Sequence, residues 1–202
     1  PAAPPRDPGY GELAADLAAV ADEHGATQAL GVSMGAATLL RLLAGTPDRF
    51  AKVVLLLPAA LDAARHDDAV RRVAALTGAL AAGDRAAVVA AVRRELPSDL
   101  AGPAVEAYVA ARADFLVASP GLPALLAALP EDRPVPDRTA LAAVSADVLV
   151  LAQEGDPLHP ADVGRQLAAV LPRARLVVFE HPGVVFRERA RLRELISSHL
   201  AG

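Results

Sequence analysis

The chain of 202 residues is long enough for one domain, with or without a subdomain. Its net charge of −4 at pH 7 argues against a nucleic-acid partner, and without cysteine it forms neither disulfides nor thiolate sites. No apolar run reaches the roughly 20 residues that a membrane span needs, and the proline-rich start lacks the apolar centre of a signal peptide.

The first predicted elements alternate between helix and strand. Apolar residues at helical spacing predict a helix over 10–23, which ends near Gly25. A short strand over 27–32 and a helix over 36–44 follow. The stretch 53–57 is apolar on both faces, as a central strand of a parallel sheet is. This order predicts half of a doubly wound α/β sheet.

A G-x-S-x-G motif joins the first strand to the next helix. It reads Gly31-Val32-Ser33-Met34-Gly35. A strand that turns into a helix so sharply holds its serine in a strained conformation at the positive end of the helix, as a nucleophile. We expect both glycines to sit where no Cβ fits. The alternatives are a flexible turn with an unreactive serine and, less well matched, a phosphate-binding loop.

The next part of the chain breaks this alternation. It contains four predicted helices and no strand pattern: 63–82, 84–96, 103–117 and 122–129. A proline-rich return loop over 131–137 follows. We expect residues 63–146 to form a helical cap over the carboxyl ends of the strands, and residues 1–62 and 147–202 to form the α/β core.

Alternation resumes after residue 146. The chain continues with a buried strand over 147–151, a loop over 153–158 and a helix over 161–171 that starts at Pro160. A last strand over 176–179 and a terminal helix over 186–200 complete the predicted sheet.

A nucleophilic serine needs a base and an orienting carboxylate. Asp156 follows a strand, in Gly155-Asp156-Pro157-Leu158-His159-Pro160. With the motif around Ser33, this makes residues 10–62 and 147–202 resemble the second half of an α/β-hydrolase-fold protein. The resemblance implies an α/β fold with a mostly parallel sheet, Ser33 as nucleophile, Asp156 as acid, and the backbone N–H of Met34 in the oxyanion hole.

The choice of the base is the open question. The family usually has a Gly-His pair after the last strand, and the corresponding pair here is Gly183-Val184. His181, three residues before Val184, is the predicted base because it is the histidine that follows the last strand. His159 is the alternative, and a triad without any base is the third possibility.

The resemblance also implies strands before the chain's first helix and a second oxyanion donor upstream of Pro1. We therefore expect the N-terminal strands of the family to be missing. The edge of strand 27–32 would be covered by a missing N-terminal segment or by another copy of the chain.

These features predict a cytoplasmic serine hydrolase that acts on an ester, thioester or similar small acyl substrate. We expect no cofactor, no metal, no nucleic acid and no membrane partner. The competing hypothesis is a catalytically silent α/β-hydrolase-fold protein that binds a small ligand or a protein partner.

Overall fold

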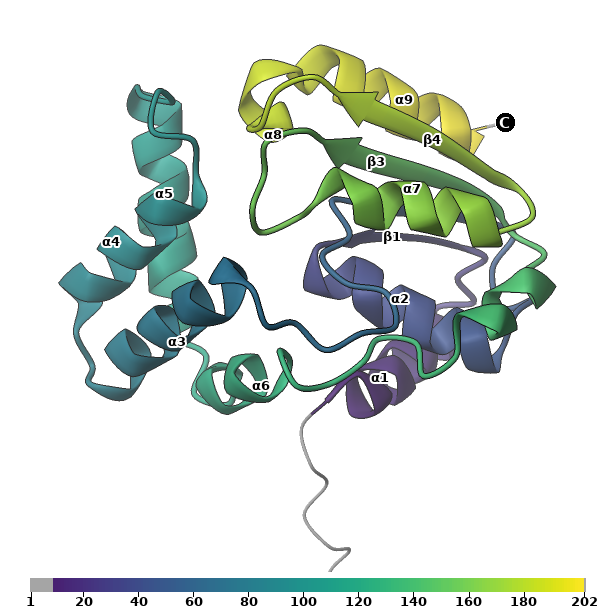
Figure 1. Ribbon diagram of the computed structural model, residues 1–202, viewed down its shortest axis with the longest axis horizontal. Helices are drawn as coiled ribbons and strands as arrows, with labels where there is room; N and C mark the ends of the chain where they lie inside the picture. Colours follow the sequence, from purple (N-terminus) through teal and green to yellow (C-terminus); the bar gives the residue numbers. More distant parts are fainter. Residues whose placement is uncertain (1–8, 202) are drawn as a thin grey trace, which may run out of the picture.

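A four-stranded parallel sheet lies at the centre of the computed structural model, which describes residues 9–201 (Figure 1). The strand order is β1-β2-β3-β4, and all three pairings are parallel. The strands are β1 (Gln28–Val32), β2 (Lys52–Leu56), β3 (Asp147–Gln153) and β4 (Ala174–Phe179). The predicted α/β class with a parallel sheet is confirmed.

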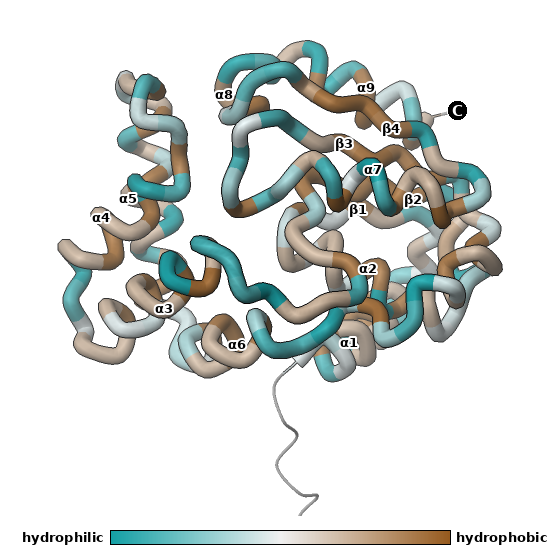
Figure 2. The backbone as a smooth tube through the Cα atoms, in the orientation of Figure 1, coloured by the Kyte–Doolittle hydropathy of each residue, from teal (hydrophilic) through white to brown (hydrophobic). Residues whose placement is uncertain are grey.

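Helices cover both faces of this sheet. Helices α1 (Tyr10–Glu23), α2 (Met34–Gly45) and α7 (Ala161–Val170) share one hydrophobic core with the 3-10 helix η1 (Arg138–Ala143) and one face of β2 and β3. Helices α8 (Val184–Arg187) and α9 (Arg189–Ala201) pack on the other face. Apolar stretches accordingly follow the strands in Figure 2. Because the strands follow one another in chain order with right-handed crossovers, their connecting helices collect on one face.

The insertion between β2 and β3 forms a separate helical group beside the sheet (Figure 1). Its helices are α3 (Asp68–Ala81), α4 (Arg85–Glu95), α5 (Pro103–Val117) and α6 (Leu122–Ala128). They enclose a hydrophobic cluster of their own. In residues 9–201 no single helix has the length and apolar character for a membrane span, although α5 and α6 together, bent by 97°, meet the criterion of length and composition.

The ends of the insertion show two details that the sequence did not predict. Helix α3 starts at Asp68 rather than at 63, because the Asp67 carboxylate caps it by accepting from Ala69 N. Toward β3, Val135, Leu141 and Val144 pack in the core beneath the sheet. The division at residues 63 and 146 stays a prediction.

The predicted terminal helix over 186–200 is two helices in the structure. Gly183 has a left-handed φ of 90° and begins the short helix α8, and α9 follows after Glu188. Val184 is fully buried against the sheet, so the turn at Gly183 lies close to the core.

Strand β1 lies at one edge of the sheet in the described part of the chain. Leu30 and Val32, on the same side of β1, are each 45% exposed. They point to the same face of the sheet as Val54 and Leu56 of β2, which α8 and α9 cover, so this face is less covered at β1. That another segment or another copy covers this edge stays a prediction.

Candidate active site

Ser33 sits in a strained turn between β1 and α2. Its φ of 51° is in the left-handed region, and its N–H donates to Leu56 O at 3.0 Å. A Cβ at Gly31 would lie 2.4 Å from Gly35 O, so no side chain fits there, as expected. The expectation for Gly35 was wrong, because a Cβ there would point into open space. Only the Gly31 side of the turn is crowded, because the backbone of Gly35 and Ala36 lies directly over Gly31.

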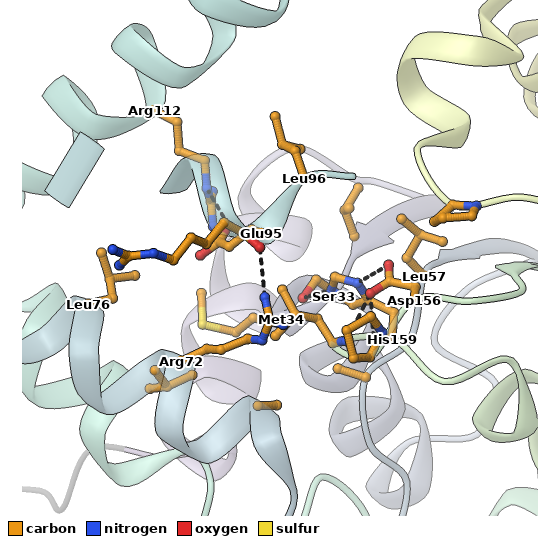
Figure 3. A pocket seen from close by; sticks show the side chains of 18 of the residues that line it. Ser33, Met34, Leu57, Arg72, Leu76, Glu95, Leu96, Arg112, Asp156 and His159 are labelled. Atoms are coloured by element: carbon orange, nitrogen blue, oxygen red, sulfur yellow. Dashed lines mark hydrogen bonds and ion pairs between the residues drawn. The ribbon is translucent and has the colours of Figure 1, made fainter. Parts of the chain in front are cut away.

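His159 is the histidine that contacts this serine. Its Nε2 lies 2.9 Å from Ser33 Oγ, and its Nδ1 lies 2.8 Å from Asp156 Oδ2. Figure 3 shows the three side chains converging at one end of the pocket. With the proton on Nδ1, the imidazole donates to Asp156 and its Nε2 accepts from the serine hydroxyl. A serine, an imidazole and a carboxylate are thus joined in one hydrogen-bonded chain.

A tight loop after β3 brings His159 to this place. Asp156 Oδ1 accepts from Leu158 N at 2.8 Å and from His159 N at 3.2 Å, which folds the loop back on its own carboxylate. Arg65 holds the loop from outside, donating to Leu158 O at 2.5 Å and to Pro157 O at 3.1 Å. The two carboxylate oxygens of Asp156 therefore have different partners: Oδ1 accepts from the backbone of the loop, and Oδ2 contacts the imidazole.

The structure does not bring His181 to Ser33. His181 is exposed on the turn after β4 and does not line the pocket. The prediction of His181 as the residue beside Ser33 is therefore corrected to His159. The physical reason is the turn at Gly183: it points Val184 into the core and leaves His181 in solvent.

Gln153 is a buried side chain that the sequence did not single out. It is 4% exposed, at the end of β3. Its Oε1 accepts from the backbone N–H groups of Gly183 and Val184, each at 2.9 Å, and its Nε2 donates to Asp156 Oδ2 at 2.6 Å. Gln153 thus ties the Asp156 carboxylate to the turn at Gly183 and Val184, after β4.

The hydrogen bonds to Asp156 change its acidity. Burial alone would raise the pKa of its carboxyl, but the hydrogen bond and charge of His159, and hydrogen bonds from Gln153 and Leu158 N, outweigh burial and lower the pKa from 3.8 to about 2. Asp156 is therefore ionised wherever an imidazole can act as a base.

This lowered pKa predicts a loss of stability in acid. Since the folded-state pKa lies below the ordinary value, the contribution of Asp156 is complete above about pH 4 and is lost as the pH falls toward 2. We expect the free energy of unfolding to fall by about 1–2 kcal/mol more in the parent than in Asp156→Asn over that interval, allowing for solvent screening. Urea unfolding at pH 6, 4, 3 and 2 measures this. Asp16→Asn, at an exposed position on α1, is the control and should follow the parent.

A large cavity lies above the serine, between the sheet and the helical insertion. Its volume is about 1270 Å³. Ser33, Asp156 and His159 line it from the sheet side, and apolar side chains line it from the insertion, among them Leu76, Leu96, Leu116, Leu122 and Leu126. Figure 3 shows Leu76 and Leu96 away from the group formed by Ser33, Asp156 and His159. The helical group thus encloses the space that a substrate of Ser33 would occupy.

Met34 lines the same cavity as the first residue of α2. The first N–H groups of a helix have no partner within the helix, and they lie at its positive end. The N–H of Met34 is therefore free of the helical ladder and next to Ser33. This position suits a donor for a developing oxyanion.

Comparisons with known proteins agree with this architecture. A family model described as "alpha/beta hydrolase fold" matches residues 2–184. No curated protein matches the chain.

Solved structures with the same fold have low sequence identity to the chain. An esterase from Exiguobacterium antarcticum is 20% identical with a TM-score of 0.78, over 99% of this chain and 76% of that one. A 2-hydroxy-6-oxo-6-phenylhexa-2,4-dienoate hydrolase from Rhodococcus sp. strain RHA1 is 21% identical, with a TM-score of 0.72, over 96% of this chain and 71% of that one. A bromoperoxidase from Bacillus anthracis is 16% identical, with a TM-score of 0.76, over 100% and 77%. At these identities the likeness is one of fold.

Proposed function

Because the chain belongs to the alpha/beta hydrolase fold family, we propose that it is a serine hydrolase that cleaves an ester, thioester or similar small acyl substrate. The observation that carries this proposal is the hydrogen-bonded chain from Ser33 through His159 to Asp156, with distances of 2.9 and 2.8 Å. These are the contacts that nucleophilic catalysis by serine requires.

In the proposed reaction Ser33 Oγ attacks the carbonyl carbon of the substrate. The hydroxyl proton passes to His159 Nε2, and the carbonyl oxygen becomes an oxyanion beside the N–H of Met34. Asp156 stabilises the imidazolium through Nδ1–H. When the carbon–oxygen or carbon–sulfur bond breaks, His159 gives its proton to the leaving alcohol or thiol. Water, deprotonated by His159, then releases the acid from the acyl-serine and restores the Ser33 hydroxyl.

The competing hypothesis of a silent binding protein was based on Val184, which stands where the family usually has its base. The contact of His159 with Ser33 weakens that argument, since an imidazole reaches the serine from another loop. A cavity of about 1270 Å³ next to the pair gives an acyl substrate room to bind. Both observations favour the hydrolase.

Active-site labelling tests the proposal. We expect a fluorophosphonate probe to label the parent chain and not Ser33→Ala, because the probe reacts with a serine whose proton has an acceptor. Ser98→Ala is the matched control, because Ser98 lines the same cavity and should be dispensable. Mass spectrometry of the labelled peptide identifies the site. A folded parent chain that stays unlabelled, or labelling that persists in Ser33→Ala, would contradict the proposal.

A further inference from the structure

Positive charge gathers around the cavity although the chain as a whole is acidic. Five arginines line the cavity, against two carboxylates, whereas the chain has a net charge of −4. Clefts with one sign of charge and apolar walls concentrate ligands of the opposite sign. The excess of positive charge would favour a negatively charged substrate, provided that neighbouring groups do not neutralise the arginines.

Most of these charges have partners. Both carboxylates are engaged: Asp156 by the triad, and Glu95 by Arg112, whose Nε lies 3.3 Å from Glu95 Oε2. Arg65 pairs with Asp67 outside the lining, and Arg93 donates to the backbone of its own segment. These contacts explain Arg65, Arg93 and Arg112 as parts of the fold, and the fifth arginine, Arg94, is exposed to solvent, which screens its charge.

Arg72 is different. It points from α3 into the pocket (Figure 3). Its Nη1 donates to Arg94 O at 2.7 Å, which fixes the guanidinium in place. Within residues 9–201 no carboxylate lies within ion-pair distance of Arg72, and its buried Nε has no hydrogen-bond partner. A fixed guanidinium with uncompensated charge in a largely apolar cavity is a binding group for a carboxylate.

We propose that the substrate carries a carboxylate, and that Arg72 binds it while Ser33 attacks an ester or thioester at the other end of the same molecule. The apolar side chains of the helical group then contact the aliphatic or aromatic part between the two ends. This inference rests on the proposed function and adds the class of substrate: monoesters or monothioesters of dicarboxylic acids.

Two matched esters test it. Methyl hydrogen adipate and methyl hexanoate differ by a carboxylate in place of a terminal methyl group. We expect the parent chain to hydrolyse the charged ester with the higher kcat/KM. In Arg72→Gln we expect kcat/KM for the charged ester to fall about 10- to 100-fold, mainly through KM, the range for one lost charged hydrogen bond. Methyl hexanoate should change less than about threefold.

Arg71→Gln is the matched control, since Arg71 is the neighbouring residue of α3, is exposed, and does not line the cavity. It should behave as the parent does. Arg72→Lys, which keeps the charge, should restore part of the preference. Equal losses of kcat/KM for both esters in Arg72→Gln, or no preference of the parent for the charged ester, would overturn this inference. The serine hydrolase proposal would still be supported if the parent hydrolyses methyl hexanoate.

A binding measurement separates the two proposals further. Ser33→Ala keeps the cavity, and we expect it to bind adipate in calorimetry with a Kd about 10- to 100-fold lower than Ser33→Ala with Arg72→Gln. Equal affinity of the two proteins for adipate would overturn the inference. Adipate binding without fluorophosphonate labelling of the parent would leave Arg72 as an anion site and refute the hydrolase.

Discussion

Replacement of His159 by alanine is expected to lower ester hydrolysis and fluorophosphonate labelling by about 10³-fold. The imidazole is the group within hydrogen-bond distance of Ser33 Oγ, so its loss leaves the serine proton without an acceptor. The corresponding change at His181 should leave both rates within about twofold, because His181 is exposed and does not line the cavity. Initial rates of hydrolysis and time courses of labelling measure the effect.

A loss of folding could imitate this result, because His159→Ala leaves the Asp156 carboxylate without its partner. His159→Asn addresses this, since its amide can still donate to Asp156. We expect His159→Asn to melt close to the parent and to remain as inactive as His159→Ala. Labelling of either variant at the parental rate, or its loss in His181→Ala, would show that His159 is not the base.

The second large effect is expected at Gly31. In Gly31→Ala the new Cβ would lie 2.4 Å from Gly35 O and 2.6 Å from Ala36 N, both of them backbone atoms that cannot turn away. We expect a loss of at least about 3 kcal/mol in the free energy of unfolding, the range of severe backbone strain. Since the turn carries Ser33, labelling should be lost as well. Chemical unfolding followed by circular dichroism gives the free energy.

Gly35→Ala is the matched control on the other side of Ser33. A Cβ there meets no atom within 4 Å, and alanine favours a helix more than glycine does. We expect Gly35→Ala to unfold within about 1 kcal/mol of the parent. Equal stability of the two variants would contradict the one-sided crowding of the turn.

The sequence predicted the parts of the site that depend on local pattern. Ser33 could be found because glycine spacing, a preceding strand and a following helix are all read within a few residues. Asp156 could be found because it follows a buried strand. Both lie where predicted, at the carboxyl ends of β1 and β3.

The contact with His159 could not be predicted in the same way. It joins residues 126 positions apart, and its formation depends on how one side chain of the loop folds back on the backbone. The available signal was the spacing of three residues between Asp156 and His159. The prediction did not use it, because it looked for the histidine after the last strand. The break between α8 and α9 escaped prediction for a related reason, because the burial of Val184 is a tertiary effect.

That Asp156 and His159 share one short loop has a consequence for the entropy of assembling the site. When the acid and the base follow different strands, folding must bring three distant points of the chain together. Here Asp156 and His159 are three residues apart, so bringing them together costs little entropy, because that cost grows with the logarithm of the separation. A single long-range approach, of β3 to β1 across β2, remains to be made. Opening fluctuations at β4 would therefore leave the carboxylate–imidazole pair assembled.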